Sequence, residues 1–142
     1  MYQVQRKNKI TEQLQLVHAN GDVACTIDVD INVDQLGPKI NKAYELVGIA
    51  QLELEKDATS DAAVTAFGEA VLGLFSVIFG DDGCQKIINF YGNRAAWGEM
   101  LIDLFPFIND EIIPKVQEAS ELRKRQLVEM GKAAKHRRKW SR

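Results

Sequence analysis

Oxygen-bearing side chains alternate along residues 28–34 with the spacing that begins a calcium-binding loop: Asp28, Asp30, Asn32 and Asp34. An EF-hand loop starting at Asp28 would need a glycine at its sixth position and a glutamate at its twelfth. The chain has Val33 and Lys39 at these places. A period of two is also that of one face of a β-strand. We interpret these residues as the solvent-facing side of a strand and assign no metal ligand.

The other reactive side chains lack partners at catalytic spacing. Cys84 lies near an expected helix start, where the helix dipole favours a thiolate, but a nucleophile also needs a base and a group that orients it. His18 falls on the apolar side of an expected strand, opposite Val23, where a partly buried structural role is favoured. Gly68 and Gly73 have phosphate-loop spacing, but no Lys follows and both lie inside an expected helix. The sequence therefore predicts no enzyme, no catalytic residue and no cofactor.

The 142-residue chain has a net charge of −2 that is divided unevenly. From Lys115 onward there are ten Lys or Arg and three Glu, a balance of +7, which leaves −9 for the rest. An acidic body with a basic end favours docking onto copies of itself or onto a charged partner. Nucleic acid could bind such a basic end through its phosphates. A run of basic residues at a chain end is, however, more commonly a solvated segment that binds no nucleic acid. We expect one domain over residues 1–131 and a basic, flexible tail over residues 132–142.

Residues 62–80 form the one run that approaches the length and apolarity of a membrane span. Glu69 lies near its centre, where a carboxylate costs about 2.5–3.5 kcal/mol or more. Asp81 and Asp82 follow the run, and no Lys or Arg flanks it. We therefore expect a buried core helix and no contact with a membrane. The polar first residues and the two isolated cysteines favour a reducing cytoplasm.

Asn20-Gly21 is a strong signal for a β-hairpin with a two-residue type I′ turn. The resulting register pairs apolar positions across the strands: Leu16 with Cys25, Leu14 with Ile27 and Ile10 with Ile31. Both strands then present their apolar residues on one side, which predicts a hairpin over about residues 10–33. A lone hairpin is marginally stable in water, so this face must pack on helices or on a neighbour. Residues 1–5, in which Tyr2 and Val4 alternate, are a candidate third strand.

Apolar residues at helical spacing follow over about residues 36–130. Four breaks divide this region: Asp57–Asp61, Gly80, Gly92-Asn93 and Pro106. Pro38 suits the first turn of a helix that begins at Asp34 or Gly37, and Thr59 or Ser60 can cap the next one. The sequence therefore predicts an α+β fold, in which an antiparallel hairpin precedes a bundle of about four to five helices.

Five segments occur together and in an order that resembles a known family: Tyr2–Lys9, Ile27–Val33, Leu74–Gly80, Ile87–Tyr91 and Met100–Val116. Over about residues 2–126 the chain is similar to the tail assembly chaperones of siphovirus-type phages and prophages of Gram-positive bacteria. The resemblance implies a non-catalytic protein of the bacterial host cytoplasm. Such a protein binds the tape measure protein, keeps it soluble during tail morphogenesis and forms homo-oligomers. One departure is the stretch 92–98, which is looser than the family pattern.

The resemblance also implies an apolar partner-binding surface, for which the broken helices between Gly83 and Phe107 could form a groove. We assign this surface to five residues: Trp97, Leu101, Phe105, Phe107 and Ile112. We expect its aromatic members to contribute more to association than any charge. Two other functions remain open. One is a structural virion component, such as a tail tube or head–tail connector protein, and a less favoured one is a small nucleic-acid-binding regulator.

Overall fold

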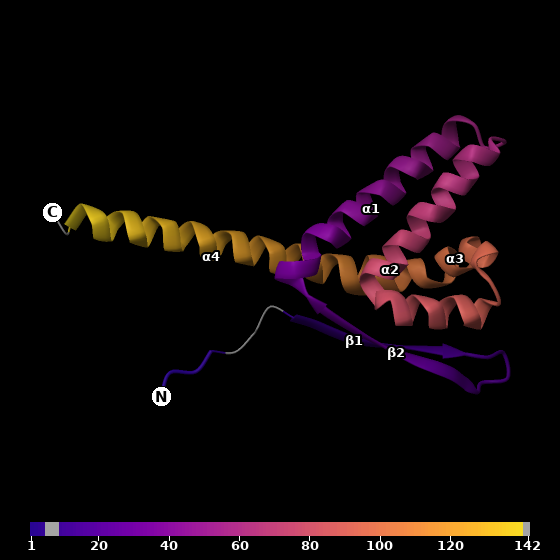
Figure 1. The fold of residues 1–142 in the computed structure, drawn as a ribbon, viewed down its shortest axis with the longest axis horizontal. Helices are drawn as coiled ribbons and strands as arrows, with labels where there is room; N and C mark the ends of the chain where they lie inside the picture. Colours follow the sequence, from indigo (N-terminus) through magenta and orange to yellow (C-terminus); the bar gives the residue numbers. More distant parts are fainter. Residues whose placement is uncertain (5–8, 141–142) are drawn as a thin grey trace.

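The hairpin has the register that the alternation predicts. In the computed structural model, which describes residues 1–4 and 9–140, β1 spans Lys9–Val17 and β2 spans Val23–Asn32. The strands are antiparallel and pair as expected: Leu16 with Cys25, Leu14 with Ile27 and Ile10 with Ile31. Val29 and Ile31 are fully buried on the face that meets the helices (Figure 1). Of the predicted third strand, residues 1–4 are not in the sheet, and Gln5 lies outside the described residues.

The predicted two-residue type I′ turn is wrong. Such a turn needs a positive φ at both Asn20 and Gly21. Gly21 has a φ of 91°, but within the described residues no residue other than glycine has a positive φ, so Asn20 does not meet the requirement. The His18 N–H donates to the Asp22 carbonyl at 2.8 Å, and the Gly21 N–H donates to the His18 carbonyl at 2.9 Å. The loop is therefore one residue longer than predicted. The register shifts beside it, so that Val17 and not His18 pairs with Val23, and His18 is exposed.

The first helix, α1 (Val33–Lys56), follows β2 without a linker. Asn32 caps it, because its side-chain oxygen accepts a hydrogen bond from the Gln35 N–H at 3.3 Å. The helix thus begins earlier than the sequence predicts, and Pro38 lies within it rather than in its first turn. After the polar break at Asp57–Asp61, the Ser60 side chain caps the second helix by accepting a hydrogen bond from the Ala63 N–H at 3.2 Å. Ser60 is one of the two caps that the sequence predicts.

The second helical element, α2 (Asp61–Tyr91), consists of two helices joined at a kink, and the first ends at Gly80, as the sequence predicts. Gly80 has a φ of 74° and a ψ of 167°, a conformation available essentially to glycine alone. Gly80 itself is therefore not helical, and the chain bends sharply there between the two arms of α2. The first arm of α2 pairs with α1, and the second arm runs along the hairpin (Figure 1). A short 3₁₀ turn, η1 (Arg94–Ala96), follows after Gly92.

The third helical segment is continuous from residue 97 to residue 140. It consists of α3 (Trp97–Phe107), one π-helical turn η2 (Ile108–Ile112) and α4 (Ile113–Trp140). In the π-turn the Ile113 N–H donates to the Ile108 carbonyl, five residues back. The helical segment thus continues past Pro106, where the sequence predicts an end, and through Asn109 and Asp110, where it predicts the start of the last helix.

The predicted bundle of four to five helices is therefore wrong. The described residues form three long helical segments after a two-stranded hairpin, and the fold is α+β only in this broad sense. The core lies where the hairpin, α2 and the start of α4 meet, and it contains fully buried side chains from each: Ile31, Leu74, Phe75, Ile87, Ile112 and Val116. The Tyr44 hydroxyl donates to Asn109 at 2.7 Å and joins α1 to the π-turn.

Candidate partner-binding surface

Helix α3 presents an apolar surface that the chain itself does not cover. Ile102 is 76% exposed and Phe105 is 37% exposed, and Leu101 beside them is half-buried. The spacing of three and four residues puts the three side chains on one side of the helix. Met100, Leu104 and Ile108 occupy the other side and are buried in the core. We call Leu101, Ile102 and Phe105 the α3 patch.

The α3 patch has an acidic edge. Glu99 and Asp103 on α3 and Asp110 on the π-turn η2 are exposed, and residues 95–114 contain four acidic residues and no Lys or Arg. Asp103 accepts a hydrogen bond from the Tyr91 hydroxyl at 2.8 Å, which fixes this carboxylate against the second arm of α2. Burial raises the pKa of the Tyr91 phenol, and the hydrogen bond and negative charge of Asp103 raise it further. The patch is therefore suited to an amphipathic partner that carries positive charge.

The structure brings only two of the five predicted site residues into this patch. Leu101 and Phe105 reach the surface, whereas Ile112 is fully buried in the core. Trp97 is half-buried, packs edge-to-face on Phe67 at a ring-centroid distance of 5.4 Å and covers Gly68. Phe107 is half-buried and stacks on Phe79 at 6.2 Å. Trp97 and Phe107 thus hold α3 against α2, and Ile112 belongs to the core, so none of the three offers a surface to a partner.

Sequence reasoning missed Ile102, the most exposed member of the patch. A signal was present, because Met100, Leu104 and Ile108 recur every four residues and mark the buried side of the helix. Ile102 lies on the opposite side from this stripe, as 100° per residue requires.

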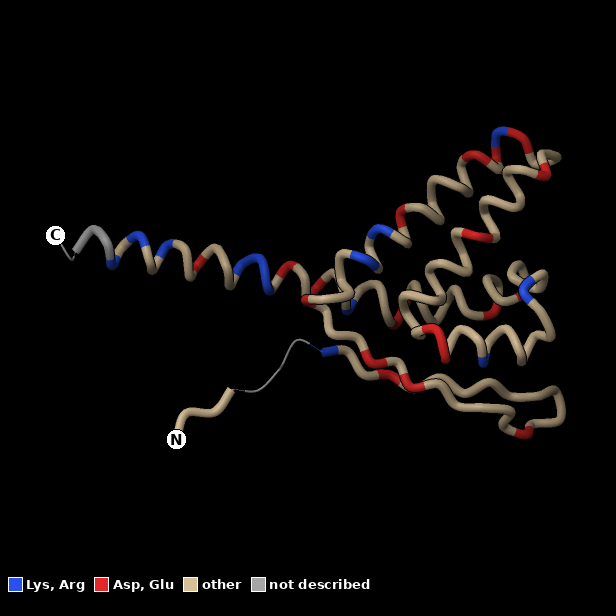
Figure 2. Tube along the Cα trace, in the orientation of Figure 1, with Lys and Arg blue, Asp and Glu red and all other residues tan. Residues whose placement is uncertain are grey.

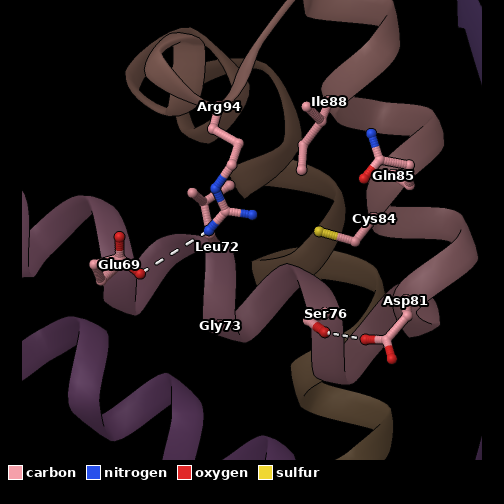
Figure 3. Close-up of a pocket in the computed structure, with 9 residues that line it drawn as sticks. All are labelled: Glu69, Leu72, Gly73, Ser76, Asp81, Cys84, Gln85, Ile88 and Arg94. Carbon is pink, nitrogen blue, oxygen red and sulfur yellow. Dashed lines mark hydrogen bonds and ion pairs between the residues drawn. The ribbon is translucent and has the colours of Figure 1, made fainter.

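A pocket of about 310 Å³ lies between the two arms of α2 and the 3₁₀ turn (Figure 3). It is lined by Leu72, Gly73, Ser76, Gln85, Ile88, Cys84, Glu69, Asp81 and Arg94. Arg94 extends toward Glu69, and their charged atoms are 4.0 Å apart. The Ser76 hydroxyl donates to Asp81 at 2.7 Å across the Gly80 bend. Both contacts tie the walls of the pocket together.

The Cys84 thiol points into this pocket but is poorly placed for chemistry (Figure 3). Burial raises its pKa, opposed by the positive charge of Arg94 and assisted by the negative charge of Asp81. The thiol is therefore protonated near neutral pH, and the pocket lining includes no imidazole that could activate it. The geometry does not make this pocket a nucleophilic site.

The alternating oxygen side chains of residues 28–34 are engaged with other groups. Asp30 pairs with Lys9 at 3.1 Å, and Asp28 accepts from the Gln13 amide at 3.0 Å. Asn32 caps α1, and Asp34 binds Arg123. Over residues 1–4 and 9–140, no group of three or more His, Cys, Asp or Glu side chains is arranged to hold a metal ion.

Helix α2 is long and apolar enough to cross a membrane by length and composition alone. In this fold 39% of the most apolar 18-residue stretch of α2 is buried inside the protein. Val71, Leu74 and Phe75 are fully buried there and form part of the core. The Gly80 bend lies within this helix and turns the second arm toward the hairpin.

Beyond residue 123, α4 extends away from the rest of the protein (Figure 1). Arg123 is the last described side chain of α4 that is not exposed, and every side chain from Lys124 to Arg137 is exposed. Most charged residues on this part are basic, as Figure 2 shows. We call residues 124–140 the projecting half of α4. It includes most of the predicted flexible tail, and the structure continues it as a helix through Trp140.

Comparisons with protein-family models, curated proteins and solved structures return no match for this chain. The resemblance to tail assembly chaperones therefore stands on sequence motifs. Two of these motifs have a clear place in the fold. Leu74–Gly80 leads into the bend of α2, and Met100–Val116 contains the α3 patch, the π-turn and the start of α4.

Proposed function

We propose that this protein is a tail assembly chaperone that binds a tape measure protein and keeps it soluble during phage tail morphogenesis. The α3 patch is the observation that carries the proposal. It is an apolar helix surface left uncovered within Met100–Val116, the longest segment of the resemblance. Contiguous exposed apolar side chains rimmed by polar residues are typical of protein-binding surfaces.

The partner implied by the resemblance is long, helical and prone to aggregate. An amphipathic helix can lay its apolar side on the α3 patch and so remove both apolar surfaces from water. Complete burial of one side chain such as Ile102 contributes about 1.5–3 kcal/mol. A single patch therefore binds weakly, and many copies along one extended partner would supply avidity.

The test is co-expression of this chain with its tape measure protein, followed by affinity capture and light scattering. The wild-type chain is expected to hold the partner in a soluble complex with several copies per partner. The double variant Ile102→Glu with Phe105→Ala is expected to leave the partner insoluble. Ile49→Glu on α1, where Ile49 is 49% exposed, is the matched control and is expected to behave as wild type.

Three outcomes would count against this function. The patch variant could support solubility as well as wild type, although circular dichroism shows it folded. The wild-type chain could fail to bind the tape measure protein at all. The chain could also be found as a lasting component of purified virions, which would favour the structural virion role, because a chaperone leaves before the particle is complete.

A further inference from the structure

The projecting half of α4 lacks any cover from the described part of its own chain. It leaves the body after Arg123, whose guanidinium holds Asp34 at the start of α1. A solvated helix of this length gains little stability from its own hydrogen bonds, because helices in proteins are stabilised mainly by packing one face. A partner for this helix would supply the missing contacts.

One side of this helix is apolar. Leu127 and Met130 are exposed, and at 100° per residue they continue the side on which Val116 is buried in the core, whereas the exposed Val128 lies on another side. We call Leu127 and Met130 the α4 stripe. The side of α4 that is buried in the core at Val116 is therefore exposed to solvent in the projecting half of the helix.

The charge around the α4 stripe is strongly positive. Residues 122–137 contain six Lys or Arg and a single Glu. Lys124 and Lys132 lie within exposed ion pairs with Glu121 and Glu129, at 3.6 Å and 3.4 Å. Such pairs contribute little and exchange readily for other partners. Two copies of this helix would repel each other, so a complementary acidic surface is favoured over pairing of α4 with α4.

The α3 patch has the matching properties, since it is apolar and its edge is acidic. It cannot receive the α4 stripe of its own chain, because α3 and the projecting half of α4 lie at opposite ends of one continuous helical segment (Figure 1). We propose that the projecting half of α4 docks on the α3 patch of a second copy of this chain. This goes beyond the proposed function and is measured on the chain alone. The tape measure protein and a neighbour's α4 would be alternative occupants of one patch.

The experiment is sedimentation velocity of the full chain and of two charge-reversal variants. One variant, Lys124→Glu with Lys132→Glu, changes the α4 side, and the other, Glu99→Lys with Asp110→Lys, changes the α3 side. Each variant alone is expected to self-associate about tenfold more weakly than wild type, or worse. An equimolar mixture of the two is expected to regain association, because every reversed surface then finds a complementary one.

Two controls separate this docking from general charge effects. Lys42→Glu with Glu45→Lys changes exposed residues of α1 and is expected to leave self-association unchanged. Raising the salt from about 0.1 M to about 1 M shortens the Debye length from about 10 Å to about 3 Å and is expected to weaken wild-type association. Circular dichroism of each variant verifies that α4 is still helical.

The proposal is overturned if the wild-type chain stays monomeric up to the highest soluble concentration. It is also overturned if both reversal variants associate as wild type does, or if their mixture fails to regain association while each remains folded. Capture of a generic duplex DNA by the wild-type chain, lost in the α4 variant and without any self-association, would instead assign the basic helix to nucleic acid.

Discussion

Arg123 binds Asp34 through two parallel hydrogen bonds, from Nε to Oδ1 at 2.9 Å and from Nη2 to Oδ2 at 3.0 Å. The pair joins residues 89 positions apart, at the point where α4 leaves the body and α1 begins. Asp34 also lies in the first turn of α1, where negative charge is favoured by the helix dipole. A planar guanidinium matches a carboxylate in this two-pronged geometry, which the ammonium of lysine cannot reproduce.

Arg123→Ala is expected to lower the free energy of unfolding by about 0.5–1 kcal/mol, because both side chains of the pair are partly exposed. Arg123→Lys is expected to recover only part of this loss. Urea denaturation measures both effects. Lys124→Ala, at the neighbouring exposed position, is the control, and a loss as large as that of Arg123→Ala would show that the ion pair has no special role.

Gly68→Ala tests how closely α3 packs on α2. A Cβ at this position would lie 2.7 Å from the Trp97 ring, which is closer than atoms can approach without movement. We expect a net loss of about 1–2 kcal/mol, since overpacking costs about 1–3 kcal/mol and alanine returns up to about 1 kcal/mol of helix propensity. The fluorescence of Trp97 should also change. Gly73→Ala, in the same helix with open space around it, is expected to stabilise the protein.

Gly80→Ala tests the bend in α2. No atom lies within 4 Å of a Cβ built at Gly80, so any cost comes from the backbone conformation alone. A non-glycine residue in this region of φ and ψ costs about 1–3 kcal/mol. Thermal and urea denaturation are expected to show this loss. Gly48→Ala in α1, which also has open space around it, should not destabilise, and equal effects of the two substitutions would contradict a strained bend.

The raised pKa of Tyr91 predicts a loss of stability at alkaline pH. The ordinary pKa of tyrosine is about 10, and the folded protein keeps this phenol protonated to higher pH through burial and the contact with Asp103. Above about pH 10 the unfolded chain releases the proton but the folded chain does not, so the free energy of unfolding falls as pH rises. Below that pH the contribution is fully present.

Tyr91→Phe is expected to make this alkaline decline shallower. Urea denaturation on either side of about pH 10 measures the slope, and a near-ultraviolet absorbance titration counts the phenols that ionise late. If the variant and the wild type decline equally, the Tyr91 hydroxyl is not the group that links stability to pH. The variant also removes the hydrogen bond to Asp103 and so frees this carboxylate at the edge of the α3 patch.

The hairpin could be predicted from the sequence because its signals are local and agree with one another. The period of two along Ile27, Val29 and Ile31 defines one face, and the position of Asn20-Gly21 sets the register. The length of the turn could not be predicted, because the same dipeptide fits loops of two and three residues. The helix cap at Ser60 was equally local and is confirmed.

The number of helices could not be predicted from the local sequence. Gly80 and Pro106 are both residues that end helices, but whether the chain stops or bends depends on what packs on either side. Here the core contacts of Phe75 and Ile87 hold both arms of α2, and the π-turn supplies hydrogen bonds beyond Pro106. The predicted partner-binding residues include Ile112 and omit Ile102 for a related reason. Apolar identity alone does not distinguish Ile112, which is buried, from Ile102, which is exposed.

The continuity of the helix from Trp97 to Trp140 has a consequence for the size of any assembly. Two complementary surfaces at opposite ends of one helix make a heterologous contact, so each copy that adds to a row presents a fresh surface of the same kind at its outer end. Unless the rotation between neighbours closes a ring, such a row has no internal stop. Its length is then set from outside, by protein concentration or by the extent of the molecule along which the copies gather.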